Sequence, residues 1–276
     1  MAEASEFIVR CYDREGVAAA VLGALERQHG SLAGLAPDDL MAVDEFHIRG
    51  REATAELAGL LGDLDGVNVL DLGSGLGGTS RFLASRFGCR VTGIDITPGF
   101  VDLAARLSAL VGLAERTTFR QASALEPPFP GGSFDLVWLE HVQMNIGAKD
   151  QLAAAIAAML RSGGRLACYE IFAADGGAPH FPVPWADTPA GSFLVRADVF
   201  RQALEDAGLE TVTWRDVTQP GLEWFTALRQ RLADSGPPPI GLHLLMGEAA
   251  PAKLGNIGRN LAENRIGVMQ GVFRKR

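Results

Sequence analysis

Two hydrophobic patterns alternate along most of the chain. Short apolar runs such as 66–72 and 133–139 are typical of buried strands, and the segments between them repeat apolar residues every three or four positions, as amphipathic helices do. This alternation predicts an α/β fold, with a parallel sheet covered on both faces by helices. The expected strands are 66–72, 89–95, 116–122, 133–139, 163–173 and 208–216, and the helices among them are 78–87, 98–111, 148–161 and 196–207.

The segments outside this alternation predict a lid and a cap. Residues 15–29 and 51–61 have helical periodicity and precede the first strand. We therefore divide the chain into an N-terminal helical lid (1–62), a ligand-binding core (63–216) and a helical cap followed by the last strand (217–276).

Two segments in the second half of the chain are predicted to lie at a ligand site. Residues 174–195 form a loop rich in Gly, Pro and aromatic residues, and loops of that length are usually functional. Residues 217–265 are mostly helical, with a break at 236–239. We expect them to cover the carboxyl edge of the sheet, where open α/β sheets bind their ligands.

A glycine cluster follows the first core strand. Gly73, Gly75 and Gly78 satisfy the G-x-G-x-x-G pattern, in which glycines let the backbone come close to a ligand. The next strand ends in Asp95, 22 residues after Gly73, the spacing at which a carboxylate can hold two ribose hydroxyls. The pattern predicts a cofactor that contains a nucleoside.

The residues around the glycines favour S-adenosylmethionine over a dinucleotide. Asp71 precedes them, and its carboxylate would repel a pyrophosphate but suits a ligand with an ammonium and a sulfonium. About 65 residues also come before the first core strand, whereas dinucleotide folds usually begin with it. An NAD-dependent oxidoreductase remains the alternative, because it also explains the glycines.

Four segments together resemble class I S-adenosylmethionine-dependent methyltransferases of the small-molecule type. They occur in the family's order and are residues 69–78, 94–97, 130–135 and 160–166. The resemblance implies a Rossmann-like sheet of seven strands, the last of them antiparallel, for which 266–273 is the candidate. The flanking segments 44–50, 141–146 and 260–273 are similar to the branch that holds sarcosine/dimethylglycine N-methyltransferases and ubiquinone-type and natural-product methyltransferases.

The resemblance implies methyl transfer to a small-molecule acceptor. N-methylation of a small amine or amino acid is favoured by the resemblance alone, with O- or C-methylation of an aromatic, quinone or isoprenoid close behind. The apolar run 242–246 in the cap favours the second. A third hypothesis is that the chain binds the cofactor for a reaction other than methyl transfer, such as a cyclisation.

Cofactor contacts are expected from residues at the ends of the first four core strands. Asp95 would hold the ribose, Ile96 would pack on the adenine, and Asp71 and the backbone near Glu140 would face the methionine ammonium. Ser123 stands where the family commonly carries an acidic residue near adenine. The full predicted set is Asp71, Gly73, Ser74, Gly75, Asp95, Ile96, Ser123, Ala124 and Glu140.

Chemistry is expected from residues after the fourth strand and in the lid. His141 is the candidate general base, because an imidazole is neutral near pH 7, although it could instead only orient its loop. Tyr12 could face the sulfonium, and His47 could line the acceptor site, though ordinary packing or loop anchoring explains such residues more often. Gln143, Asn145 and Trp185 are the candidate acceptor contacts.

Composition restricts the partners. The chain has 276 residues and a net charge of −8, without a run of Lys or Arg, so we expect neither nucleic acid nor a membrane surface as partner. Its three scattered cysteines indicate a reduced, cytoplasmic protein, and the histidines lack metal-ligand spacing. The oligomeric state stays open, with a homodimer among the options.

Overall fold

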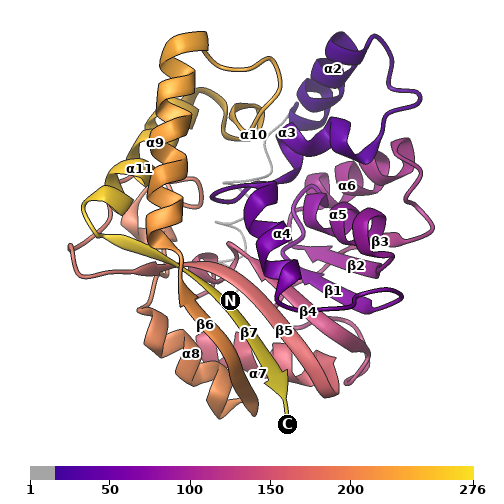
Figure 1. The fold of residues 1–276 in the computed structure, drawn as a ribbon, viewed down its shortest axis with the longest axis vertical. Helices are drawn as coiled ribbons and strands as arrows, with labels where there is room; N and C mark the ends of the chain where they lie inside the picture. Colours follow the sequence, from indigo (N-terminus) through magenta and orange to yellow (C-terminus); the bar gives the residue numbers. More distant parts are fainter. Residues whose placement is uncertain (1–15) are drawn as a thin grey trace.

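The computed structural model describes residues 16–276 and contains a seven-stranded sheet (Figure 1). The strands are β1 (Asn68–Leu72), β2 (Arg90–Asp95), β3 (Thr117–Gln121), β4 (Phe134–Glu140), β5 (Leu160–Ala173), β6 (Leu209–Asp216) and β7 (Ile266–Lys275). Their order across the sheet is β3-β2-β1-β4-β5-β7-β6. Strands β1 to β5 pair in parallel, whereas β7 runs antiparallel to β5 and β6. The predicted Rossmann-like fold, with its antiparallel last strand, is confirmed.

Helices cover both faces of this sheet. The α-helices of the described residues are α2 (Val17–His29), α3 (Met41–Asp44), α4 (Arg51–Gly59), α5 (Gly78–Phe87), α6 (Pro98–Leu110), α7 (Lys149–Met159), α8 (Ala197–Asp206), α9 (Thr218–Ser235), α10 (His243–Met246) and α11 (Ala250–Ala262). Apolar residues of α4, α5, α9 and α11 pack with one set of strand side chains, and those of α7 and α8 pack with the other. The period-2 alternation of strand side chains produces these two buried layers.

Strand β5 begins three residues earlier than predicted. It starts at Leu160, which pairs with Phe134, and the register then shifts before Leu136 meets Arg165. Gly163, at φ 73°, and Gly164 lie in this irregular stretch. The glycine pair is typical of a strand start, but here it marks a bulge inside the strand.

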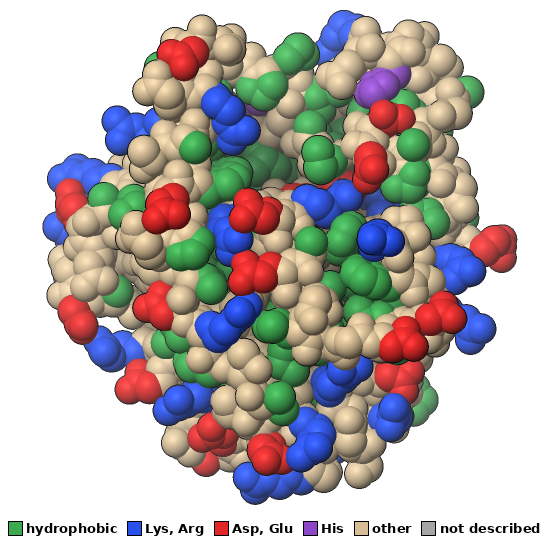
Figure 2. Space-filling view, viewed as in Figure 1, with side chains coloured by type: hydrophobic (Ala, Val, Ile, Leu, Met, Phe, Trp, Pro, Cys, Tyr) green, Lys and Arg blue, Asp and Glu red, His purple; other side chains and the backbone are tan. Residues whose placement is uncertain are grey.

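A third apolar cluster holds the lid and the cap above the carboxyl edge of the sheet. It joins Val21 and Leu25 of α2, Leu107 of α6 and Leu245 of α10 in the cap. Helices α9, α10 and α11 stand beside α2 and α3 at this end of the molecule (Figure 1). The surface is hollowed between them, and hydrophobic side chains gather in the hollow (Figure 2).

The lid is fixed to the core through the start of α5. Arg81 is 1% exposed, and its Nη2 donates to Asp44 Oδ1 at 2.5 Å and to the Leu76 carbonyl at 2.6 Å. Gly78 packs against the backbone of Asp44, and a Cβ at position 78 would be 2.0 Å from the Asp44 carbonyl oxygen. The last glycine of the motif therefore permits lid–core packing. Within residues 16–276, no helix combines the length and apolarity that a membrane crossing requires.

Candidate active site

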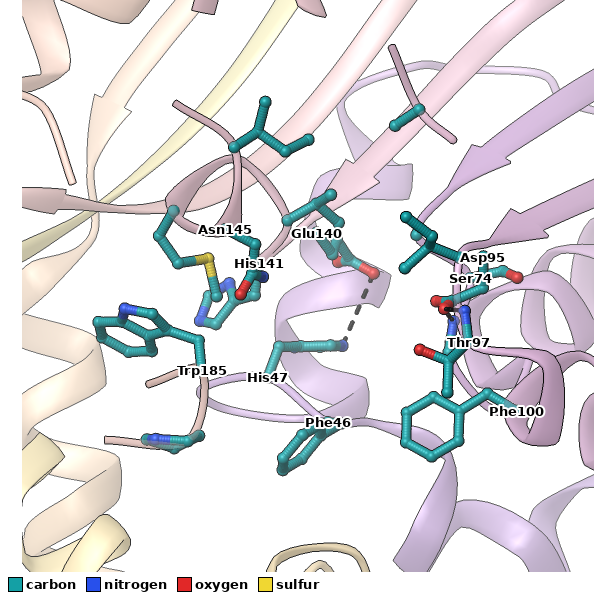
Figure 3. A pocket seen from close by; sticks show the side chains of 18 of the residues that line it. Phe46, His47, Ser74, Asp95, Thr97, Phe100, Glu140, His141, Asn145 and Trp185 are labelled. Carbon is teal, nitrogen blue, oxygen red and sulfur yellow. Dashed lines mark hydrogen bonds and ion pairs between the residues drawn. The ribbon is translucent and has the colours of Figure 1, made fainter. Parts of the chain in front are cut away.

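A cavity of about 510 Å³ opens at the carboxyl ends of β1, β2 and β4, beneath the lid and the cap. Glu140 and His47 lie in its middle (Figure 3). On one side of them are Ser74, Asp95, Thr97 and Phe100, and on the other are His141, Asn145 and Trp185. The cavity therefore has two halves, one formed by the glycine loop and β2, and one by the loop after β4, the 174–195 loop and the cap.

The glycine loop and Asp95 are held together by backbone hydrogen bonds. The Gly75 N–H donates to Asp95 Oδ2 at 3.0 Å, and the Thr97 N–H donates to Oδ1 at 2.8 Å. Gly73 has φ 73°, and a Cβ there would be 2.5 Å from Val142 Cγ2. These contacts explain why glycine is needed at position 73, and they place the Asp95 carboxylate beside the loop backbone.

The glycine-loop half is acidic. Asp71 is 3% exposed, accepts a hydrogen bond from the Ser80 hydroxyl at 2.6 Å and lines the cavity; burial raises its pKa to about 7. Asp44, Asp95 and Glu140 line the cavity too, whereas no Lys or Arg does among the described residues. A pyrophosphate would meet carboxylates here without a Lys or Arg partner, which disfavours the NAD alternative.

The middle of the cavity holds a buried imidazole between two carboxylates. His47 Nε2 lies 2.8 Å from Glu45 Oε2 and 3.6 Å from Glu140 Oε2. The Thr79 hydroxyl donates to Glu140 Oε2 at 2.6 Å. Burial alone would lower the pKa of His47, but the carboxylates of Glu140 and Glu45 raise it to about 9. His47 is therefore an imidazolium near neutral pH.

Glu140 places its side chain in the cavity, where the sequence predicts only a backbone contact. The side chain is 5% exposed. Its Oε1 makes no hydrogen bond of normal geometry in the described part of the chain, although the Trp138 indole lies close enough to stabilise its charged form, and Ser74 Oγ has no partner there. Two buried acceptors that lack a hydrogen bond of normal geometry in the glycine-loop half are consistent with a ligand that carries donors.

His141 is fixed by the backbone on both sides of its ring. It has φ 53°, its Nδ1 lies 3.0 Å from the Tyr169 carbonyl oxygen, and its Nε2 accepts from the Ile48 N–H at 3.3 Å. Burial and the charge on His47 lower its pKa to about 3. These contacts favour the second of the two predicted roles, in which His141 orients the loop.

Gln143, a predicted acceptor contact, does not line the cavity. Its side chain is fully buried outside the cavity lining, and its Nε2 donates to the Ile171 carbonyl at 2.5 Å. The backbone N–H groups of Val142 and Gln143 donate to the buried carboxylate of Glu170. Lys149 also donates to the Gln143 carbonyl. The polar side chain at 143 therefore holds the loop after β4 in place instead of facing a ligand.

The other predicted residues divide into cavity-lining positions and one position outside the described residues. Ile96, Ser123, Ala124, Asn145 and Trp185 line the cavity. The Trp185 Nε1 donates to the Ser192 hydroxyl at 2.9 Å, which orients its ring within the loop. Tyr12 lies outside the described residues.

Several residues in the cavity lining or in contact with it have no role that the sequence predicts. Glu45 lies in a segment notable only for its family resemblance, yet it is 4% exposed and binds His47, Thr54 and Arg51. The sequence feature that could have indicated a role for Glu45 is the acidic pair Asp44 and Glu45 close to His47 in an otherwise apolar segment. The half formed by the loop after β4, the 174–195 loop and the cap also contains residues from four separate segments, which no local pattern connects: Phe46, Met144, Phe193, Trp224, Phe225, Leu245 and Ile257.

Comparisons with known proteins agree with this architecture. The methyltransferase-domain family model matches residues 70–168. The chain is 38% identical over 98 residues to the tocopherol O-methyltransferase of Arabidopsis thaliana, a match that covers 36% of this chain and 28% of that protein. It is 26% identical over 199 residues to the sarcosine/dimethylglycine N-methyltransferase of Halorhodospira halochloris, covering 72% of this chain and 71% of that protein.

A solved structure matches almost the whole chain. The geranyl diphosphate C-methyltransferase of Streptomyces coelicolor superposes with a TM-score of 0.70 at 19% identity, over 99% of this chain and 98% of that chain. At that identity the likeness concerns the fold. For the first three curated relatives the match spans 27%, 28% and 66% of their lengths. Residues 70–168 therefore match a methyltransferase domain, and the chain as a whole shares its fold with solved methyltransferases.

Proposed function

We propose that the protein transfers the methyl group of S-adenosylmethionine to an apolar small-molecule acceptor. When bound, the cofactor supplies a methyl carbon on a sulfonium, whose C–S bond breaks with its electron pair going to sulfur as the acceptor bonds to the carbon. The chain's own task is to align the acceptor, exclude water and remove a proton.

The acidic half of the cavity is the proposed cofactor site. Asp95 would accept the ribose hydroxyls, Ile96, Ser123 and Ala124 would surround the adenine, and the backbone at 73–75 would border the ribose and methionine. Asp71 and Glu140 would face the ammonium. Support comes from the two buried acceptors that lack a hydrogen bond of normal geometry and from a lining that carries carboxylates but no Lys or Arg among the described residues.

The acceptor class rests on the lining of the other half. This half is lined by Trp185, Phe193, Trp224 and Leu254 and by no Lys or Arg of the described residues. The imidazolium of His47 at its border is already paired with Glu45 and Glu140. An acceptor carboxylate would be buried there without a partner, which is costly. We therefore place O- or C-methylation of an aromatic, quinone or isoprenoid-like acceptor ahead of N-methylation of a small amino acid, with Asn145 as its polar contact.

A pair of acceptors that differ in one group tests this proposal. We expect a neutral apolar phenol or alcohol to be methylated with a kcat/KM at least about 100-fold higher than its analogue bearing a carboxylate, because an unpaired buried charge costs several kcal/mol. The measurement is labelled-methyl incorporation, with S-adenosylhomocysteine counted in parallel. Equal or better use of the carboxylate would contradict the assignment of an apolar acceptor.

The same assay separates the alternatives. S-adenosylhomocysteine that forms only when an acceptor is present supports methyl transfer. Conversion of a substrate while S-adenosylmethionine stays intact would favour a reaction of the cyclisation type.

We also propose a cytoplasmic location, which is consistent with the buried free thiols of Cys89 and Cys168.

A further inference from the structure

The cluster in the middle of the cavity joins the two halves of the site. Glu140 Oε2 accepts from Thr79 and faces His47, while Glu140 Oε1 makes no hydrogen bond of normal geometry within residues 16–276. His47 and Glu140 both line the cavity. A cationic ligand in the acidic half would therefore compete with the imidazolium of His47 for the same carboxylate.

The proton of interest lies on one particular nitrogen. His47 Nδ1 lies 3.3 Å from the Ile48 carbonyl oxygen. Because a carbonyl oxygen can only accept a hydrogen bond, Nδ1 carries a proton whether the ring is neutral or charged. Nε2 faces Glu45, Glu140 and the Thr54 hydroxyl, which is 3.1 Å away. The proton that His47 can lose therefore sits on Nε2, between the two carboxylates.

On this basis, and resting on the proposed function, we propose that His47 is the catalytic base and that binding of the cationic cofactor prepares it by displacing its Nε2 proton. The neutral Nε2 then accepts the acceptor's proton: the O–H bond breaks, its electron pair stays on oxygen, and His47 returns to the imidazolium form. One proton leaves on cofactor binding and one is taken from the acceptor, so the protein ends the cycle in its starting charge state.

Charge balance favours a proton over a metal ion in this cluster. Ligand atoms of Glu45, His47 and Glu140 all lie within 4.8 Å of one another, a spacing that could also hold a cation. Arg51, however, already pairs with Glu45 at 2.5 Å. With an imidazolium, the two carboxylates and Arg51 sum to zero charge, whereas a divalent ion beside neutral His47 would leave a net positive charge.

Three neighbouring groups, His141, Tyr169 and Asp71, do not supply this proton at alkaline pH, whereas burial raises the pKa of Glu140 and raises that of Glu170 to about 8, so the His47→Gln variant has to identify the source. The rings of His141 and Tyr169 lie 5.8 and 5.9 Å from the His47 ring. The pKa of His141 is about 3, and burial raises that of Tyr169 above its usual range, so neither titrates near pH 8. Asp71 has a pKa of about 7 and is mostly ionised at pH 8, where His47, at about 9, is still protonated.

The test counts protons during cofactor binding. We would titrate the protein with S-adenosylmethionine at pH 8 by calorimetry, in buffers of different ionisation enthalpy, and expect release of about one proton. S-adenosylhomocysteine keeps the ammonium that we place at Glu140 but lacks the sulfonium charge, so its proton release should be no larger than that of S-adenosylmethionine. In His47→Gln the release should disappear while the heat of binding persists. His180→Gln is the matched control, because His180 forms a surface imidazole–carboxylate pair with Glu263 at 2.7 Å outside the cavity.

Each outcome decides the proposal. Binding heat that does not depend on the buffer in the wild-type protein overturns it, even if His47→Gln does not fold. Equal proton release from His47→Gln and the wild type also overturns it, because another group would then be the source. Loss of binding on chelation, restored by Mg²⁺ or Mn²⁺, would assign the cluster to a metal and overturn it too. Absence of any heat with S-adenosylmethionine would contradict the proposed function itself.

Discussion

Replacing Gly78 with alanine is expected to destabilise the protein by at least about 1–3 kcal/mol. The new Cβ would lie 2.0 Å from the carbonyl oxygen of Asp44 and 2.4 Å from its carbonyl carbon. Both are backbone atoms that cannot rotate away, so the lid must move off the start of α5. Asp44 also holds Arg81, and a buried guanidinium that loses its partner adds to the loss.

Urea unfolding and cofactor titration would measure this effect. Cofactor affinity should fall as well, because residues 43, 44 and 46–48 form one wall of the cavity. Gly255→Ala is the matched control: Gly255 lies inside α11, and a Cβ at this position would meet no neighbouring atom within 4 Å, so alanine there should stabilise by up to about 1 kcal/mol. Similar stability changes in the two variants would contradict the assigned role of Gly78.

Replacing Asp95 with asparagine is expected to weaken S-adenosylmethionine binding about 100-fold. Each carboxylate oxygen of Asp95 accepts a backbone N–H, from Gly75 and from Thr97. An amide nitrogen would turn one of these contacts into two donors facing each other and would disturb the glycine loop. It would also replace an acceptor that we assign to the ribose hydroxyls.

Calorimetric titration would give the affinity, with thermal unfolding as a check that the variant folds. Asp135→Asn is the control, because Asp135 also accepts a backbone N–H, from Asn68 at 2.9 Å, but near the start of β4 and outside the cavity lining. Its cofactor affinity should stay within about twofold of the wild type. An Asp95→Asn protein that binds as tightly as the Asp135→Asn protein would remove Asp95 from the site.

The order of strands and helices is predictable from the sequence because each buried strand is a local apolar run with turn residues at its ends. The glycine loop and Asp95 are predictable for a related reason. Both lie at strand ends, and the carboxyl ends of parallel strands meet at one edge of the sheet. Their contact, from Gly75 N–H to Asp95, follows from that geometry.

The middle of the cavity depends on contacts between distant segments, which local patterns do not specify. Ile48 meets His141 across 93 residues of chain, and Glu140 meets His47 only because the lid folds over β4. The same limit explains Gln143, whose polar side chain at the sheet edge indicated a ligand contact. Its actual partner is the Ile171 carbonyl of the neighbouring strand.

The measurement that tests the central claim most directly is a thermal-shift titration of the wild-type protein with S-adenosylmethionine, S-adenosylhomocysteine, NAD and NADP. We expect a dose-dependent rise in Tm with the first two and none with the dinucleotides, because a ligand that binds only the folded state stabilises it increasingly as its concentration exceeds Kd. A rise with NAD or NADP alone, or no rise with either S-adenosyl compound, would contradict the assignment of this cavity to a methyl donor.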